Sequence, residues 1–382
     1  MANKLKNELT NEPAPVIRQG AIALLGRADA PTDAVQEYCE HLRDGLLGQG
    51  ISLGIERVAW AERGWRRALR SLRRHAKGWR GMWVLVQYTA LAWSARGFPR
   101  HLMRVLRILK GAGLRIAVVY HDAGPFPGTR WIDRLRRRAQ LRLMRAALDF
   151  CDVAVCTVPA EKLSWMGAQN GKAVFIPVGA NLAPNSAGQP RKQMVSNGQL
   201  SVAVFGITGG KATAREIGEI AEAVRYAAAR IKALRLMVFG RNAKETEGQL
   251  RKSLEGAPVE LQVLGLLSSE NVAKSLRACD VQLFVRGPIS SRRGSALAGI
   301  ACGVPVIAFA GPETAAPITE AGIAFYSPDK KGELGEVLLH VLQDEHYRVS
   351  LAQRCWVAQQ RYFSWTAIAE RYAEFLRKDT QA

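Results

Sequence analysis

The stretch RGPISSRRGSALAGIACGVPVIAF, residues 286–309, decides the fold. It indicates a Gly- and Ser-rich loop with three arginines, then a helix of small apolar residues, then a buried strand. Because the loop follows the apolar run 281–285, the order strand, loop, helix, strand favours a parallel α/β sheet. Arginines and hydroxyls at a helix N-terminus can bind a diphosphate. The alternative interpretation is that Arg292 and Arg293 are solvated and Ser295 only caps the helix.

Apolar runs and helical patterns alternate on both sides of this stretch, which predicts two parallel α/β units. The expected strands are 21–26, 83–86, 116–120 and 153–158 in the first unit, and 200–205, 234–239, 260–264, 281–285, 304–309 and 323–326 in the second. Between them lies a segment rich in Pro, Ser, Gly, Asn and Gln. We therefore expect a polar tail (1–19), an N-terminal domain (20–182), a linker (183–199), a C-terminal domain (200–360) and a C-terminal helix (361–382). Ligands of such sheets bind at the carboxyl ends of the strands, so the site is expected between the domains.

A second candidate phosphate loop, GITGGK at 206–211, follows the first strand of the C-terminal unit. Glycines let the backbone approach a phosphate, and Lys211 adds charge. The loop matches neither a Walker A motif nor GxGxxG, and a purely structural strand-to-helix turn is the alternative.

Residues 290–309 resemble the donor-binding segment of family 4 glycosyltransferases of the GT-B fold. The other segments that resemble this family, in the same order, are Asp29–Asp33 with Tyr38-Cys39, Tyr120–Asp122, 176–181, Cys279–Val281 and Phe363–Trp365. The resemblance covers about residues 20–376. It implies two Rossmann-like domains that face each other across a cleft, with the C-terminal helix packed back on the N-terminal domain. It also implies hexosyl transfer from a UDP- or GDP-sugar donor, without metal or other cofactor and with retention of configuration.

The resemblance and the need to neutralise a leaving diphosphate without metal together suggest site residues. The expected catalytic residues are His121, Arg292 and Lys211. The alternative for His121 is a polar residue that fixes a turn. The expected donor-binding residues are Gly206, Gly209, Gly210, Lys211, Leu266, Leu267, Arg286, Ser290, Ser291, Arg292, Arg293, Gly294, Ser295 and Glu313. The expected acceptor-binding residues are Asp29, Asp33, Tyr88 and Asp122.

One departure from the family pattern concerns two donor-site glutamates, whose positions here hold Ser290 and Ala298. Glu313, in the loop after the next strand, is the nearest candidate for a replacement carboxylate, unless it is an ordinary exposed glutamate. Either Arg292, Arg293 and Ser295 take over donor binding in a divergent branch of the family, or the chain has lost catalysis and is a non-catalytic GT-B relative that acts as a partner subunit.

Charge is concentrated in the N-terminal domain. The 382-residue chain has a net charge of +21, and residues 63–145 hold 21 basic against 2 acidic side chains. Apolar stripes such as Trp65, Leu69, Leu72 and Ala76 predict folded helices with basic outer faces. These faces suit an anionic membrane and a lipid-linked or polysaccharide-precursor acceptor, so we expect a cytoplasmic protein on the inner face of the membrane. Nucleic-acid binding is the alternative, but no reading motif supports it.

Other sequence features exclude several classes of site. The six cysteines form no CxxC pair, which argues against zinc and disulfides and favours reduced, buried thiols. The polar N-terminus lacks the apolar core of a signal peptide, and no apolar window is long enough to span a bilayer.

Overall fold

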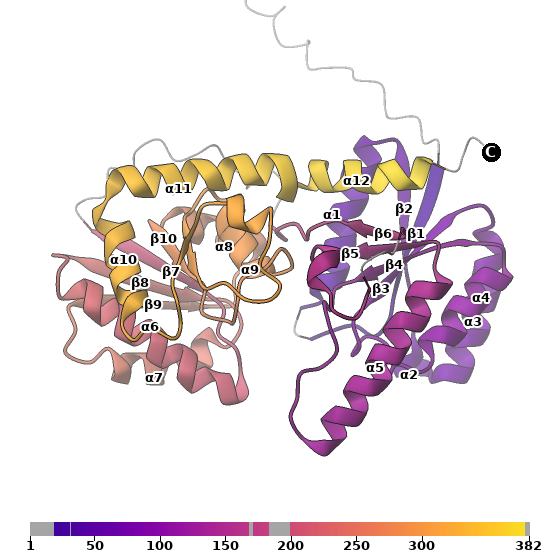
Figure 1. Cartoon of the computed structure of the whole chain (residues 1–382), viewed down its shortest axis with the longest axis horizontal. Coiled ribbons are helices and arrows are strands. Elements are labelled where there is room, and N and C mark those ends of the chain that lie inside the picture. Colours follow the sequence, from indigo (N-terminus) through magenta and orange to yellow (C-terminus); the bar gives the residue numbers. More distant parts are fainter. Residues whose placement is uncertain (1–18, 31, 168–170, 183–198, 379–382) are drawn as a thin grey trace, which may run out of the picture.

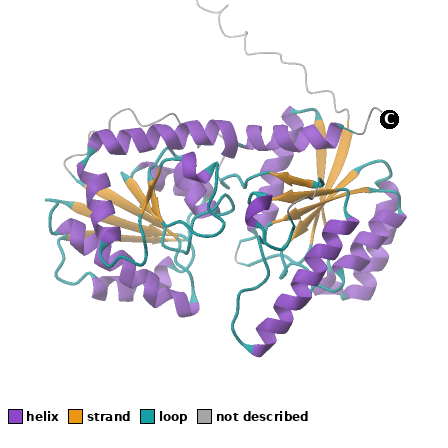
Figure 2. Cartoon of the chain, in the orientation of Figure 1, coloured by secondary structure: helices purple, strands orange, loops and turns teal. Residues whose placement is uncertain are grey.

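The computed structural model describes residues 19–30, 32–167, 171–182 and 199–378. It contains two domains, each a six-stranded parallel sheet between two layers of helices (Figures 1 and 2). The predicted tail up to residue 18 and the predicted linker from 183 to 198 lie outside the described residues.

The N-terminal sheet has the order β2-β1-β3-β4-β5-β6. Its elements are β1 (Gln19–Leu25), α1 (Ala34–Gly48), β2 (Ile51–Arg57), α2 (Trp60–Arg63), α3 (Trp65–Gly78), β3 (Trp83–Tyr88), α4 (Leu102–Gly111), β4 (Arg115–Tyr120), α5 (Trp131–Phe150), β5 (Val153–Cys156), η1 (Ala160–Lys162) and β6 (Ala173–Phe175). The sequence patterns miss β2 and β6. Both are edge strands, and β2 is mostly half-buried, so neither has the continuous apolar run of a strand covered on both faces.

The C-terminal sheet has the order β12-β11-β10-β7-β8-β9. Its elements are β7 (Leu200–Phe205), η2 (Gly210–Ala212), α6 (Thr213–Ala228), β8 (Leu234–Phe239), α7 (Ala243–Ser253), β9 (Val259–Gly265), α8 (Ser269–Arg277), β10 (Val281–Leu283), α9 (Gly294–Ala301), β11 (Val306–Ala308), η3 (Ile318–Glu320), β12 (Ile323–Phe325), α10 (Glu333–Gln343), α11 (Glu345–Ala358), η4 (Gln359–Phe363) and α12 (Trp365–Arg377). Every strand predicted for this domain is present.

Alternate residues along the N-terminal strands pack against different helix layers. On one face, Val84 and Val118 contribute to a core with α3, α4 and α5. On the other face, Leu85 and Val119 pack with α1 and α12. The three basic helices predicted from the sequence thus form one outer layer of the N-terminal domain.

The C-terminal helix returns to the N-terminal domain, as the resemblance implies. α11 and α12 run along one side of both domains (Figure 1), and residues of α12 join the core formed with α1. At its centre the Tyr38 and Tyr372 hydroxyls lie 2.9 Å apart and fully buried. The Trp365 indole also donates a hydrogen bond to the carbonyl of Ala180. The last helix therefore links the two domains.

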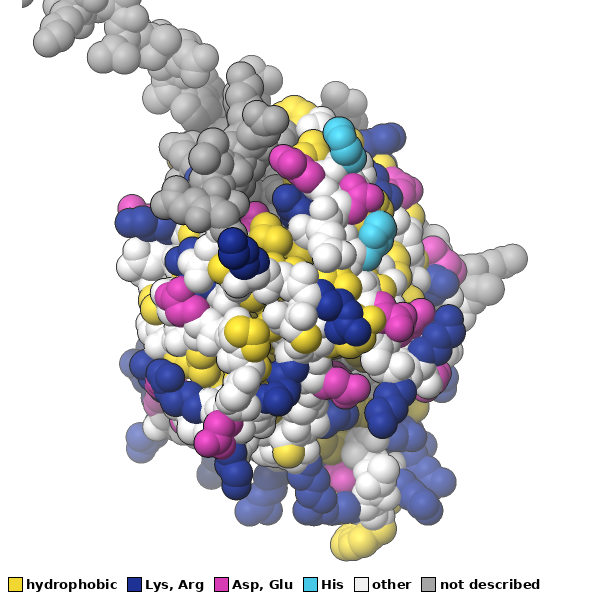
Figure 3. Space-filling view, turned by 90° about the vertical axis from the view of Figure 1, so that its left-hand side faces the viewer, with side chains coloured by type: hydrophobic (Ala, Val, Ile, Leu, Met, Phe, Trp, Pro, Cys, Tyr) yellow, Lys and Arg dark blue, Asp and Glu magenta, His cyan; other side chains and the backbone are white. Residues whose placement is uncertain are grey.

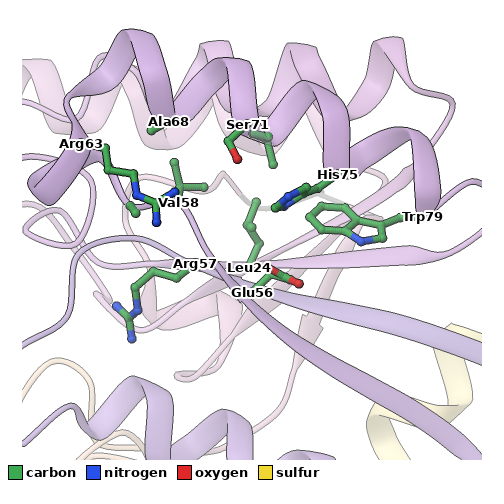
Figure 4. A pocket seen from close by; sticks show the side chains of 11 residues that line it. Leu24, Glu56, Arg57, Val58, Arg63, Ala68, Ser71, His75 and Trp79 are labelled. Carbon is green, nitrogen blue, oxygen red and sulfur yellow. The ribbon is translucent and has the colours of Figure 1, made fainter.

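Helix α3 leaves a small cavity of about 140 Å³ against the edge of the N-terminal sheet. Figure 4 shows Ser71, His75 and Trp79 on one side of it, and Leu24 and Glu56 on the other.

The bulky tryptophans of this region are mostly core residues. Trp83 and Trp93 are buried, and the rings of Trp60 and Trp65 stack on each other.

Within the described residues, no helix is both long and apolar enough to cross a membrane. All six cysteines are buried and unpaired, as the sequence predicts.

Candidate functional site

The strand orders place one crevice in each sheet. In the C-terminal sheet the chain moves outward in opposite directions from β7 and β10, and in the N-terminal sheet from β1 and β3. Ligands of open parallel sheets bind at such switch points, outside the carboxyl ends of the strands. The loops after β7 and β10 are the two candidate phosphate loops predicted from the sequence, so they are neighbours in space.

Arg292 and Glu313 form the polar centre of the loop after β10. The Nε and one terminal nitrogen of Arg292 lie 2.7 and 2.8 Å from the two carboxylate oxygens of Glu313. The Ser290 hydroxyl donates to the same carboxylate at 3.2 Å. Burial would raise the pKa of Glu313, but the hydrogen bonds and charge of Arg292 outweigh it and lower this pKa. Glu313 is therefore an ionised, half-buried carboxylate, and the fully buried Ser290 contacts it.

Arg286 and Arg293 complete a cluster of three arginines beside Glu313, and the buried Glu216 carboxylate also acts on Arg286. Burial lowers the pKa of Arg293 to about 10, and the charges of Arg292 and Arg286 act in the same direction. Its Nε is buried and has no hydrogen-bond partner among the described residues. Burial also lowers the pKa of Arg286, whose Nε lies 3.4 Å from the Thr208 hydroxyl. A cluster of arginines with an unsatisfied buried donor is suited to bind an anion.

The glycine-rich loop after β7 lies against Arg286. Gly206 has a φ of +80°, and a Cβ there would sit 3.0 Å from the Arg286 guanidinium, so only glycine suits this position. The Thr208 N–H donates to the buried Glu216 carboxylate at 2.7 Å, which anchors the loop to α6. Lys211 is exposed at the start of η2.

Other predicted donor residues have varied surroundings. Leu266 is exposed and Leu267 half-buried after β9, while Gly209 and Gly210 are exposed after β7. Gly294 begins α9 and Ser295 follows it, so Arg293, not Ser295, is the N-cap residue. Because α9 begins here, its first N–H groups point out of the helix end beside the arginines.

Ser291 belongs to the contact between the domains. Its buried hydroxyl donates to the carbonyl of Thr157 in the N-terminal domain at 2.6 Å. Its own carbonyl accepts from the N–H of Val178 at 3.0 Å. These bonds use the hydroxyl proton and the carbonyl of Ser291, and its donor-binding role stays a prediction.

His121 follows β4, at the carboxyl end of the N-terminal sheet. Its Nε2 lies 2.8 Å from Oε1 of Gln87, whose own Nε2 donates to the carbonyl of Leu85. The amide orientation makes His121 Nε2 the donor, which leaves the lone pair on Nδ1. Tyr38 packs edge-on against the ring, and burial lowers the pKa of His121 to about 4. The imidazole is thus neutral at neutral pH.

The four predicted acceptor residues differ in accessibility. Asp122 is half-buried and accepts from the Ala90 N–H at 2.7 Å. Burial raises its pKa, and the charges of Arg292 and Glu313 act on it from the other domain. Asp33 caps α1 and pairs with Arg57 at 2.8 Å. Tyr88 is completely buried in the core, so its side chain is unable to touch an acceptor in this arrangement.

Arg241, after β8, joins the domains at the fourth acceptor candidate. Its terminal nitrogen donates to the carbonyl of Thr32 at 2.7 Å and to the Thr32 hydroxyl at 2.8 Å, and it lies 3.4 Å from the Asp29 carboxylate. Sequence reasoning missed Arg241, Gln87 and Glu216. The signal for Arg241 is its position directly after a predicted strand, where side chains reach the crevice.

No group of three or more His, Cys, Asp or Glu side chains among the described residues is arranged to hold a metal ion.

Comparisons with known proteins identify the fold. No family model matches the sequence, and no curated protein matches it. Solved structures match nearly the whole chain. HepE of Anabaena, in complex with UDP and glucose, superposes with a TM-score of 0.61 at 15% identity over 94% of this chain and 99% of its own. Sucrose-phosphate synthase from Thermosynechococcus elongatus gives 0.64 at 18% identity over 94% and 98%. WaaG, a glycosyltransferase involved in lipopolysaccharide biosynthesis, gives 0.59 at 14% identity over 94% and 100%. The chain therefore has the two-domain GT-B fold.

Proposed function

We propose that this protein is a glycosyltransferase that moves a hexosyl group from a UDP- or GDP-sugar to an acceptor held by the N-terminal domain. The observation that carries the proposal is the cluster of Arg286, Arg292 and Arg293 at the switch point of the C-terminal sheet, where the buried Nε of Arg293 has no hydrogen-bond partner among the described residues. A nucleotide diphosphate supplies hydrogen-bond acceptors and negative charge for these arginines. HepE, of the same fold, is found in complex with UDP and with UDP-glucose.

In this proposal the arginines and the first N–H groups of α9 stabilise the diphosphate as the glycosidic bond breaks. Charge develops on the leaving oxygen, and preorganised donors in a half-buried site stabilise it without reorganisation. Lys211, exposed on the adjacent loop, adds a mobile positive charge. Metal independence and retention of configuration are part of the proposal and come from the family resemblance alone.

Glu313 takes the part of a donor-site carboxylate in this proposal. It is ionised, half-buried and hydrogen-bonded to Ser290, which stands where the related family has a glutamate. In the proposal, this carboxylate from the loop after β11 accepts hydrogen bonds from sugar hydroxyls beside Ser290. This contact favours the catalytic reading over a non-catalytic partner subunit.

His121 and Asp122 follow β4 at the carboxyl end of the N-terminal sheet, and the charges of Arg292 and Glu313 in the other domain act on Asp122. A neutral imidazole with a free Nδ1 lone pair can accept a hydrogen bond from a sugar hydroxyl, and its fixed tautomer sets the direction of that bond. The acceptor in this proposal is lipid-linked or a polysaccharide precursor. The basic layer of α3, α4 and α5 supports an anionic membrane surface as the place where the protein meets it.

A screen of UDP, GDP and their sugars by thermal shift tests the proposal. We expect one of these nucleotides to raise the melting temperature, and Arg292→Ala and Arg293→Ala each to remove most of the rise. The control is Arg251→Ala, because Arg251 is exposed on α7 and lies outside the arginine cluster. If no nucleotide stabilised the protein and no sugar nucleotide were hydrolysed, the proposal would be wrong, and a non-catalytic partner subunit would be the better interpretation.

A further inference from the structure

The first half of helix α5 forms an arm that extends away from the N-terminal sheet. In Figure 1 its N-terminal end is the lowest point of the molecule. Large apolar side chains are exposed there: Trp131 is 72% exposed, and Phe126 and Leu135 are each 45% exposed. Elsewhere in the domain, Leu47 and Leu91 are exposed at separate places. Trp131 and Leu135, one helical turn apart, form a small exposed apolar cluster, which is a candidate interaction site.

Basic side chains surround this apolar cluster. Trp131 and Leu135 are four residues apart and share one side of the helix, while the exposed Arg134 and Arg138 share the adjacent side. Arg130 and Arg137 are also exposed at this end of the helix. The acidic side chain of this segment, Asp133, is buried and paired with Arg136 at 2.6 Å. The outward charge of the arm is therefore entirely positive. Lys and Arg side chains are numerous along the lower edge of the molecule in Figure 3.

The arm is rigidly held. The buried Gln140 accepts from the N–H of Phe126 at 2.7 Å and donates to the carbonyl of Gly97 at 2.8 Å. The Arg136 guanidinium lies 5.1 Å from the centre of the Phe126 ring and donates to the carbonyl of Arg96. These contacts fix the loop before α5, so the exposed side chains are presented in one arrangement and little entropy is lost when they bind.

The same loop begins at the candidate site. His121 and Asp122 follow β4 directly, and Phe126 and Trp131 lie a few residues further along the chain. The arm is thereby joined through one loop to the carboxyl end of the N-terminal sheet.

A groove of about 640 Å³ between α3 and α4 extends the same basic layer. Its lining includes Arg73, Lys77, Arg104 and Arg107, with Leu69 and Ile108 as apolar floor, and it contains no acidic side chain. The positively charged surface thus extends from the end of α5 over α3 and α4. Positive charge attracts acidic lipid headgroups.

We propose that the N-terminal end of α5 is a membrane anchor, which inserts Trp131 and Leu135 at the boundary between headgroups and acyl chains of a bilayer that contains acidic phospholipids. Aromatic side chains favour this depth, and arginines beside them bind lipid phosphates. The inference rests on the proposed function, because it names the surface on which the enzyme would bind its acceptor. Membrane binding itself can be measured independently of glycosyltransferase activity.

The test is co-sedimentation of the full chain with phosphatidylcholine vesicles, with and without phosphatidylglycerol, at physiological ionic strength. We expect binding only to the acidic vesicles. The variant Trp131→Ser with Leu135→Ser should weaken it at least about tenfold, because the buried apolar area is lost. The matched control is Val349→Ser with Val357→Ser, two similarly exposed apolar residues on α11. Likewise Arg134→Glu with Arg138→Glu should abolish binding, whereas Lys252→Glu with Lys274→Glu, the same charge change on the C-terminal domain, should not.

Brominated phosphatidylcholine in the acidic vesicles gives a direct reading of insertion. We expect it to quench the tryptophan fluorescence of the unmodified protein more than that of Trp131→Phe. Equal quenching, or vesicle binding unchanged by the Trp131 and Leu135 substitutions, would overturn the inference. So would a loss of single-stranded DNA binding in that variant without a loss of vesicle binding, because the arm would then serve a nucleic acid. All variants should show the same rise in melting temperature with nucleotide as the unmodified protein. A failure of membrane binding can then be distinguished from a failure of the proposed nucleotide binding.

Discussion

Arg292 and Glu313 hold each other in a two-point ion pair, with nitrogen–oxygen distances of 2.7 and 2.8 Å. Both side chains are only partly exposed, so solvent screens the pair less than an ion pair on the open surface. The ion pair fixes the orientation of the Arg292 guanidinium. The hydrogen bond from the Ser290 hydroxyl additionally fixes the Glu313 carboxylate.

Glu313→Gln should separate binding of the sugar from binding of the diphosphate. The amide keeps the shape but loses the charge that accepts hydrogen bonds from sugar hydroxyls, so we expect the sugar nucleotide to bind roughly tenfold more weakly. UDP or GDP alone should bind equally well or more tightly, because one negative charge has been removed from its neighbourhood. Calorimetric titration of both ligands checks this, with Glu245→Gln on the exposed face of α7 as the control. Equal weakening of both ligands would contradict the role given to Glu313.

Arg293→Met should stabilise the protein without ligand and weaken nucleotide binding at the same time. The buried Nε lacks a partner among the described residues, and methionine fills much of the same space without a charge. We expect the free energy of unfolding without nucleotide to rise by about 1 kcal/mol. The melting-temperature rise with nucleotide should nearly disappear. A variant that is less stable without ligand would show that Arg293 has a structural role instead.

Most of the fold could be predicted from the sequence because parallel strands covered on both faces are continuous apolar runs. The strands of the C-terminal domain and the return of α12 are present as predicted. Strand β2 was missed because its inner residues alternate with half-buried polar ones at the sheet edge. The site was predicted less completely, because side-chain partners depend on contacts between distant segments. Ser291 and Thr157, or Arg241 and Thr32, have no local sequence signal that pairs them. The burial of Tyr88 likewise depends on how α5 covers the sheet.

Ser291→Ala should lower stability without affecting nucleotide binding. Its hydroxyl donates to the Thr157 carbonyl in a buried contact between the domains, and the substitution leaves that carbonyl unsatisfied. The expected cost is about 1–3 kcal/mol of unfolding free energy. Nucleotide affinity, measured well below the melting temperature, should be unchanged. A specific loss of affinity at unchanged stability would contradict this expectation and support the donor-binding role predicted from the sequence.

His121 should make the stability of the protein depend on pH in the mildly acidic range. Burial lowers its pKa from 6.5 to about 4, although the charge of Asp33 opposes this. Between these two values the unfolded chain binds a proton that the folded protein does not. The free energy of unfolding therefore falls as the pH is lowered, by roughly 2 kcal/mol between about pH 7 and about pH 5. Urea unfolding of the protein and of His121→Gln at both pH values checks this prediction. The variant has no titrating group at this position, so its loss of stability over the same interval should be smaller by that amount. An equal loss in both proteins would mean that the His121 imidazole is as easily protonated in the folded protein as in the unfolded chain, and the neutral tautomer assigned to it would be wrong.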